Sequence, residues 1–232
     1  MSGDMPAGSP PAQGGYLSTT AEAAKTAIDR LTFFSDAVVA IAMTLLALEL
    51  PVPQADSAGA LLDFLGDHYG EFLAFFISFF VIAQYWRGHH RLYRYVTDAP
   101  PRLVMLNILW LLTVILTPYA TRNLYGGQDV SHSDFPWRFA FYAVVQACAA
   151  ISFILAEREI QKQGLFAPET PRALLERVYT VNLALVLTFL VSIPVAFVLY
   201  AWAFAIWSLI PLWIALARMA RGRLSARSGS GT

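Results

Sequence analysis

Residues 30–50 read RLTFFSDAVVAIAMTLLALEL, and this stretch predicts a helix that crosses a lipid bilayer. About 20 apolar residues in a helix are enough to span the roughly 30 Å of hydrocarbon. Within the apolar part, Asp36 is the single ionisable residue. A charged side chain at membrane depth costs about 3 kcal/mol on insertion scales, so it needs a partner or a water-filled cavity. Asp36 is therefore a candidate functional residue.

The composition of the whole chain also indicates a membrane protein. Of the 232 residues, 57% are hydrophobic and 14% are charged, whereas an average soluble domain has about 25% charged residues. A soluble globular domain does not fit this composition. The apolar stretches predict an all-α membrane protein with six transmembrane helices. The expected spans are residues 31–50, 71–93, 103–124, 137–156, 174–193 and 195–217.

The last two expected spans need a break between them, because residues 178–216 form an apolar run that is too long for one span. Ser192 and Pro194 offer that break, since proline removes a backbone donor and restricts the residue before it. The sequence therefore predicts a tight hairpin at this position.

The basic residues predict how the helices are oriented in the membrane. Fourteen of the sixteen Lys and Arg residues lie before the first span, at the second and fourth connections, or after the last span. Arg122 and Arg138 lie on the other side. The positive-inside rule then predicts that both termini are cytoplasmic. The first external connection is acidic, and it either raises the local cation concentration or is simply a solvated loop. Its acidic residues are Glu49, Asp56, Asp63, Asp67 and Glu71.

The two ends of the chain and its chemistry-bearing residues are less informative. Residues 1–24 are expected to be a disordered cytoplasmic N-terminus, residues 25–220 the transmembrane domain, and residues 221–232 a flexible basic tail. Cys148 is the single cysteine, which excludes an intramolecular disulfide and a Cys-rich metal site. The sequence contains no Gly-rich phosphate loop or nucleophile elbow. It therefore predicts no enzyme, no cofactor and no nucleic-acid partner.

The first span has two different faces when its residues are projected at about 100° each. Ile41, Leu45 and Leu48 lie within an arc of about 60°, and Asp36 lies roughly 140° away from Ile41. The helix therefore presents a line of aliphatic side chains on one side and a carboxylate on another. Such a line faces lipid or a protein core more often than a pore, and periodicity alone does not separate these cases.

Partners for Asp36 are expected at the same depth in the neighbouring spans. The second span ends in QYWRGHHRLYR, which places Trp86, His89 and His90 near its cytoplasmic end, and Asn107 is at a similar level in the third span. A carboxylate satisfied by an imidazole and an amide is a physically sensible polar cluster. The alternative is that both histidines lie at the interface and extend toward anionic headgroups.

These residues resemble a known family. Arg30, Phe34, Ser35 and Asp36 form the motif RxxxFSD, which is followed by AVVAIAMTLLALELPVP. This stretch resembles the first span of the endolysosomal potassium channel family, transmembrane protein 175, in its bacterial single-repeat form. The YWRGHHRLYR ending of the second span and the NxLWLLTVILTPY character of the third are similar to that family as well.

The resemblance implies a potassium-permeable cation channel of the bacterial plasma membrane. In it, a homotetramer surrounds an axial pore that the first helix of each chain lines. The narrow hydrophobic layers then fall on Ile41, Leu45 and Leu48, and Thr44 supplies a polar atom between them. The expected partners are the lipid bilayer, monovalent cations and other copies of the chain. The resemblance also implies a structural and gating cluster behind the pore, drawn from Arg30, Phe34, Ser35, Asp36, Trp86, His89, His90 and Asn107.

Two other classes of protein remain open from the sequence. A proton-coupled secondary transporter would use Asp36 with His89 or His90 as a proton relay, although the chain has no inverted repeat and no pair of Gly-broken helices at the midplane. An intramembrane enzyme would need a nucleophile with a base, or a metal group, at one depth. Beyond Asp36 and the two histidines, nothing in the sequence completes such a site.

Overall fold

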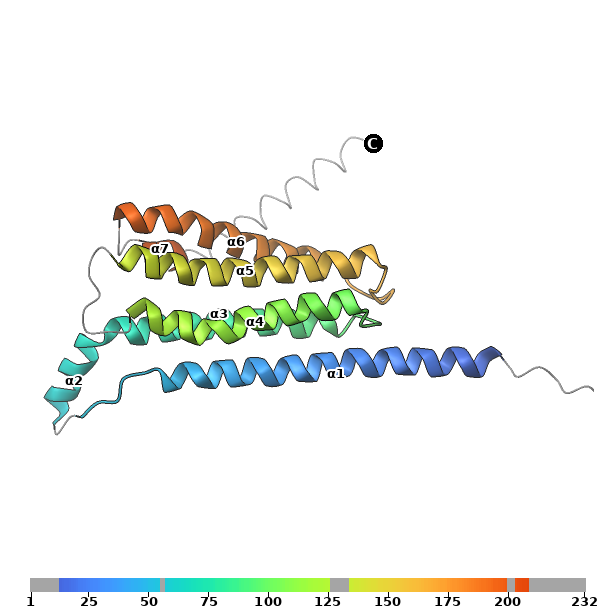
Figure 1. Ribbon diagram of the computed structural model, residues 1–232, viewed down its shortest axis with the longest axis horizontal. Coiled ribbons are helices and arrows are strands. Elements are labelled where there is room, and N and C mark those ends of the chain that lie inside the picture. The colour runs from blue at the N-terminus through green and yellow to red at the C-terminus, as the bar shows by residue number, and fades with distance from the viewer. Residues whose placement is uncertain (1–12, 55–56, 126–133, 200–202, 209–232) are drawn as a thin grey trace, which may run out of the picture.

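The computed structural model describes residues 13–54, 57–125, 134–199 and 203–208, and most of them are helical (Figure 1). Five of the helices are long and apolar enough to cross a membrane, and they overlap the first five expected spans. The five helices are α1 (Gln13–Leu48), α3 (Tyr69–Tyr93), α4 (Pro101–Tyr125), α5 (Phe135–Lys162) and α6 (Arg172–Leu199), and the shorter helices are α2 (Ala58–Asp67) and α7 (Ala203–Ser208).

The long helices are arranged in three layers (Figure 1). α1 lies along one side of the bundle and packs on α3 and α4, which form the middle, while α5 and α6 form the other side. Of the most apolar 18 residues of α1, 22% are buried, against 61% for α5. The core therefore sits between α4, α5 and α6, and α1 is attached at its edge. Large side chains that are fully buried include Trp110, Phe139, Tyr142 and Phe189.

The position predicted for the hairpin between the last two spans, at Ser192 and Pro194, is wrong. α6 continues through Ser192 and Pro194 to Leu199, and α7 packs back against it. The Ser192 hydroxyl donates to the Phe189 carbonyl at 2.7 Å and accepts from the Trp207 indole at 3.0 Å. Membrane helices tolerate proline where nearby side chains and neighbouring helices satisfy the freed backbone groups. The rest of the sixth expected span lies outside the described residues.

α1 also begins earlier than the sequence predicts. Its first residue is Gln13, although disorder is expected through residue 24. The stretch AEAAK at residues 21–25 is rich in strong helix formers. The Thr26 hydroxyl adds a bond to the Glu22 carbonyl at 2.8 Å. As a result, α1 extends past the rest of the bundle at one end (Figure 1).

The two ends of the bundle differ in charge. The end at which α3 stops and α4 starts carries Arg91, Arg94 and Arg102, and it is termed the basic end. The opposite end is termed the acidic end, and there Glu49 and Arg122 form an ion pair at 3.1 Å that joins α1 to α4. The other carboxylates that the structure describes at the acidic end are Asp63, Asp67, Glu71 and Asp134.

A glycine turn joins two connections at the basic end. α5 finishes in a Schellman turn, in which Gly164 has a φ of 65° and the Leu165 N–H bonds to the Ile160 carbonyl at 3.0 Å. A positive φ at this position favours glycine because it has no Cβ. The turn brings Phe166 into an antiparallel bridge with Val96. The α3–α4 and α5–α6 connections are therefore fixed to each other.

Gly70 sets how closely α3 and α4 approach at the acidic end. A Cβ atom on Gly70 would lie 2.8 Å from two ring carbons of Tyr125. We therefore expect Gly70→Ala to lower the free energy of unfolding by ~1–3 kcal/mol, the usual cost of overpacking, as measured by denaturation in detergent. Gly66→Ala is the matched control, because nothing lies within 4 Å of a Cβ there and alanine favours the helix. Equal stabilities of the two variants would contradict the close approach.

Candidate functional site

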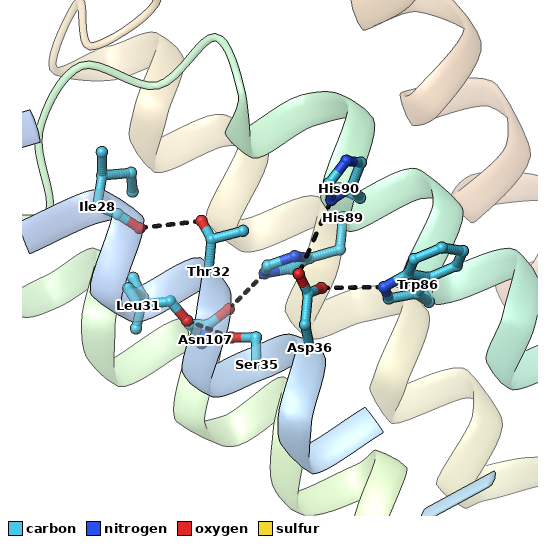
Figure 2. A network of polar contacts seen from close by, with 9 residues as sticks. All are labelled: Ile28, Leu31, Thr32, Ser35, Asp36, Trp86, His89, His90 and Asn107. Carbon is cyan, nitrogen blue, oxygen red and sulfur yellow. Dashed lines mark hydrogen bonds and ion pairs between the residues drawn. The ribbon is translucent and has the colours of Figure 1, made fainter. Parts of the chain in front are cut away.

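A buried hydrogen-bond bridge holds α1 against α3 and α4. Ser35 of α1, His89 of α3 and Asn107 of α4 are each at most 1% exposed. The Asn107 amide nitrogen donates to the Ser35 hydroxyl at 2.9 Å, and the Asn107 carbonyl oxygen lies 2.9 Å from His89 Nε2. The Ser35 hydroxyl donates in turn to the Leu31 carbonyl at 2.8 Å. Figure 2 shows these contacts, and Ser35, Asn107 and His89 are termed the anchor bridge.

The amide group of Asn107 determines which atom donates in each hydrogen bond that it makes in the anchor bridge. Because its carbonyl oxygen can only accept, His89 Nε2 carries the shared proton. The imidazole ring is stacked between two aromatic rings, with centroids 4.6 Å from Trp110 and 3.8 Å from Tyr93. His89 Nδ1 has no hydrogen-bond partner within the described part of the chain. His89 is therefore held by stacking and by one hydrogen bond.

Asp36 makes separate contacts, one residue further along α1. Trp86 Nε1 donates to Asp36 Oδ1 at 2.9 Å, and His90 Nδ1 lies 3.9 Å from Asp36 Oδ2 (Figure 2). The Asp36 side chain is 30% exposed and that of His90 is 55% exposed. Solvent screening weakens an ion pair at such exposure. The indole hydrogen bond is therefore the main restraint on the carboxylate.

The sequence predicts one polar cluster around Asp36, whereas the structure contains two separate groups: the anchor bridge and the contacts of Asp36. An imidazole, His90, lies beside Asp36 as expected, but the Asn107 amide bonds to Ser35 instead of Asp36. The reason is angular, since consecutive residues of a helix point about 100° apart. The interfacial position considered for both histidines fits the exposed His90 and does not fit the buried His89.

The first two residues of the RxxxFSD motif lie outside both groups. Phe34 is 57% exposed, and Arg30 is exposed and forms no ion pair with a described residue. Both project within about 20° of Ile41 on the helix. Within one chain, the structure therefore brings Ser35 and Asp36 to α3 and α4 and turns Arg30 and Phe34 away.

The aliphatic residues of α1 are also turned away from the rest of the chain. Ile41, Leu45 and Leu48 are 59%, 40% and 79% exposed, and they are termed the aliphatic stripe. Thr44 is exposed beside them, and its hydroxyl donates to the Ile41 carbonyl at 2.8 Å. One face of α1 therefore has no neighbour within the described chain. The buried residues of α1 lie away from this stripe and are Ile28, Leu31, Ser35, Val39, Ala42 and Leu46.

A second polar group, which the sequence motifs did not indicate, joins α3, α4 and α5 nearer the acidic end. The Thr121 hydroxyl donates to Ser78 at 2.7 Å, and Ser78 lies 3.0 Å from the Tyr142 hydroxyl. Gln146 donates to the Thr117 hydroxyl at 3.2 Å. The sequence feature that could have indicated this group is the four-residue spacing of Thr117 and Thr121, which places both hydroxyls on one face of α4.

The chemistry of these groups suits positioning rather than catalysis. Within the described ranges, no group of three or more His, Cys, Asp and Glu side chains could hold a metal ion. Ser35 gives its proton to a backbone carbonyl, and His89 bonds to an amide. Neither residue therefore forms the nucleophile–base pair that covalent catalysis needs.

Comparison with known proteins places α1, α3 and α4 in one family. Residues 30–118 match the family model described as the endosomal/lysosomal potassium channel TMEM175. A potassium channel of Streptomyces collinus is 36% identical over 143 residues, which cover 60% of this chain and 68% of that protein. The crystal structure of a lysosomal potassium-selective channel TMEM175 homolog from Chamaesiphon minutus matches with a TM-score of 0.66 and 25% identity, covering 82% of this chain and 96% of that one.

The fold and these matches define a helical membrane protein of the ion-channel class, and not an enzyme. The chain belongs to the TMEM175 potassium channel family. A chicken relative, named endosomal/lysosomal proton channel TMEM175, is 35% identical over 114 residues. Those residues cover 46% of this chain but 23% of the chicken protein. The similarity to the animal protein is therefore confined to one part of it.

The anchor bridge predicts coupling between two substitutions. Ser35→Ala and Asn107→Ala remove the two ends of one buried hydrogen bond, so the second change costs less once the first is present. We expect a coupling free energy of about 1 kcal/mol in a double-mutant cycle of unfolding in detergent. Trp86→Phe combined with Asn107→Ala is the control and should be additive, because Trp86 bonds to Asp36. Additivity of the first pair would contradict the Ser35–Asn107 bond.

Proposed function

We propose that the protein is a passive, potassium-permeable cation channel of the bacterial plasma membrane, formed by four copies of the chain around an axial pore. Related bacterial proteins are named potassium channels, which supports the class of transport. The pore-lining role of α1 rests on one observation. Its aliphatic stripe is exposed in the single chain while its opposite face is fixed by the anchor bridge.

In this assembly, the aliphatic stripe forms three rings around the pore. Ile41 and Leu45 are separated by about 6 Å along the helix axis, and Leu48 is about 4.5 Å further. Aliphatic side chains cannot replace the hydration shell of an ion as carbonyl groups do, so a narrow ring closes the path by dewetting. Selectivity is then modest. The selectivity depends on the hydrated size of the ion and on Thr44. The Thr44 hydroxyl donates its proton to the Ile41 carbonyl, so its oxygen lone pairs can coordinate a cation.

The charge of the two ends sets the orientation of the channel. The basic end and both termini face the cytoplasm, according to the positive-inside rule. The acidic end then forms the outer mouth, where carboxylates raise the local cation concentration. Glu49 is paired with Arg122 and Glu71 with His68, so Asp63 and Asp67 contribute most of this field.

The polar contacts of α1 belong to the gate in this proposal. Rotation of α1 about its axis breaks the Ser35–Asn107 bond and leaves buried polar groups unpaired, which costs about 1–3 kcal/mol for each group. The Asp36 contacts are partly exposed, and water can replace them at lower cost. Opening therefore proceeds by a tilt of α1 that keeps the Ser35–Asn107 bond and alters the contacts of Asp36 with Trp86 and His90.

Ile41→Asn tests the constriction. Asparagine carries an amide that holds water in the narrow ring, so we expect potassium flux into liposomes to rise by about tenfold, equivalent to ~1.4 kcal/mol of barrier. Leu112→Asn on α4 is the matched control, because Leu112 is 50% exposed and lies outside α1; it should leave the flux unchanged. An unchanged or lower flux in well-folded Ile41→Asn protein would count against Ile41 as the constriction.

The same liposomes distinguish a channel from a proton-coupled carrier. With a pH-sensitive dye inside, a channel dissipates a potassium gradient without a fixed number of protons moved for each potassium ion. A carrier that uses Asp36 and His90 as a relay moves the two ions at a constant ratio and saturates with potassium. A constant ratio across potassium concentrations would contradict the proposed channel.

A further inference from the structure

A cavity of about 550 Å³ lies at the basic end of the bundle. It is open to the surface and is lined by α1, by the last turn of α3 and by the two connections that the Val96–Phe166 bridge joins. The residues that matter for its chemistry are Lys25, Asp29 and Phe33 of α1, His90 and Arg94 at the end of α3, and Glu169 of the α5–α6 connection.

The cavity presents unpaired charges of both signs. Lys25 and Arg94 are cationic and Asp29 and Glu169 are anionic, and all four are exposed. None of them forms an ion pair with a described residue. The Arg94 guanidinium lies 4.9 Å from the ring centroid of Tyr95 and donates to its hydroxyl at 3.2 Å. The remaining guanidinium donors are therefore available to a ligand.

The position of the cavity indicates a ligand at the membrane surface rather than an ion in a pore. Lys25 and Asp29 project within about 20° of Asp36 on α1, and about 120–160° from Ile41. The cavity therefore lies on a different face of α1 from the aliphatic stripe. Its depth is that of lipid headgroups, because α3 ends at Tyr93 and the chain leaves the apolar layer at this level.

We propose that this cavity binds the headgroup of a phospholipid that carries both a phosphate and an ammonium group, as phosphatidylethanolamine does. The phosphate binds to Lys25 and Arg94, and the guanidinium offers two parallel donors to its oxygens. The ammonium group binds to Asp29 and Glu169. The acyl chains leave past Phe33, which is 70% exposed. An anionic lipid without an ammonium group leaves both carboxylates unpaired next to its phosphate.

A bound headgroup restrains the same helix as the anchor bridge. His90 lines the cavity, and its Nδ1 lies 3.9 Å from Asp36. The lipid therefore joins α1 to the α3–α4 and α5–α6 connections at a point about two to three turns of α1 from the anchor bridge. Lipid that binds only the folded chain also raises its stability by mass action.

Native mass spectrometry of the full chain tests the proposal with phosphatidylethanolamine and phosphatidylglycerol of identical acyl chains. We expect phosphatidylethanolamine to bind about tenfold more tightly, a difference of ~1.4 kcal/mol. Arg94→Gln and Asp29→Asn should each weaken that binding by about tenfold and abolish the rise in melting temperature that the lipid causes. Lys162→Gln and Glu176→Gln are the matched controls, because both residues are exposed charges outside the cavity, and they should bind the lipid like the wild type.

Several results would overturn the proposal. One is equal binding of the two lipids, and another is wild-type binding by both Arg94→Gln and Asp29→Asn, which is expected if a second copy of the chain fills the cavity. Displacement of the lipid by the same concentration of soluble glycerophosphoethanolamine would assign the cavity to a soluble ligand instead. If Arg94→Gln does not elute as the wild-type assembly, Arg94→Lys replaces it, and this variant should weaken the binding by less than tenfold, because it keeps the charge but loses the two parallel donors. Wild-type binding by Arg94→Lys together with wild-type binding by Asp29→Asn would overturn the proposal.

Discussion

The buried hydrogen bond between Asn107 and Ser35 determines how α1 is rotated against α3 and α4. α1 buries a small share of its apolar residues against its own chain, and apolar contacts by themselves are not directional. A buried polar contact is directional, and it fixes the rotation of the helix because other rotations leave Ser35 and Asn107 unpaired in a low-dielectric region. The stacking of His89 on Trp110 and Tyr93 holds the other side of Asn107 in place.

Once the rotation of α1 is fixed, its remaining faces acquire different surroundings. The aliphatic stripe is turned outward from the chain, and Asp36 lies on a flank where Trp86 and partial exposure to water offset the cost of a carboxylate at membrane depth. The bundle of α4, α5 and α6 is densely buried by comparison. A rigid bundle with one sparsely attached helix suits a channel in which α1 moves and the rest of the chain does not.

The positions of the long helices could be predicted from the sequence, because each span sums the hydropathy of about 20 residues. The residues of the polar layer could also be predicted, since Trp86, His89, His90 and Asn107 share one depth. Which of these residues bond to each other could not be predicted, because neighbouring positions on a helix point about 100° apart. The path of α6 through Pro194 could not be predicted either. It involves a contact between Ser192 and Trp207, which is on a different helix.

In the proposed assembly, the aliphatic stripe is in contact with water rather than lipid. Chemical modification of a cysteine placed on the stripe tests this most directly. Cys148 is the single cysteine, so Cys148→Ala gives a chain without thiols in which Ile41→Cys places one on the stripe. Methanethiosulfonate reagents react with the thiolate, which forms in water and not in hydrocarbon. We predict that Ile41→Cys is modified in liposomes with loss of potassium flux, whereas Leu112→Cys is not. An Ile41→Cys thiol that stays unmodified in the assembled protein, or whose modification leaves the flux intact, would contradict a pore lined by α1.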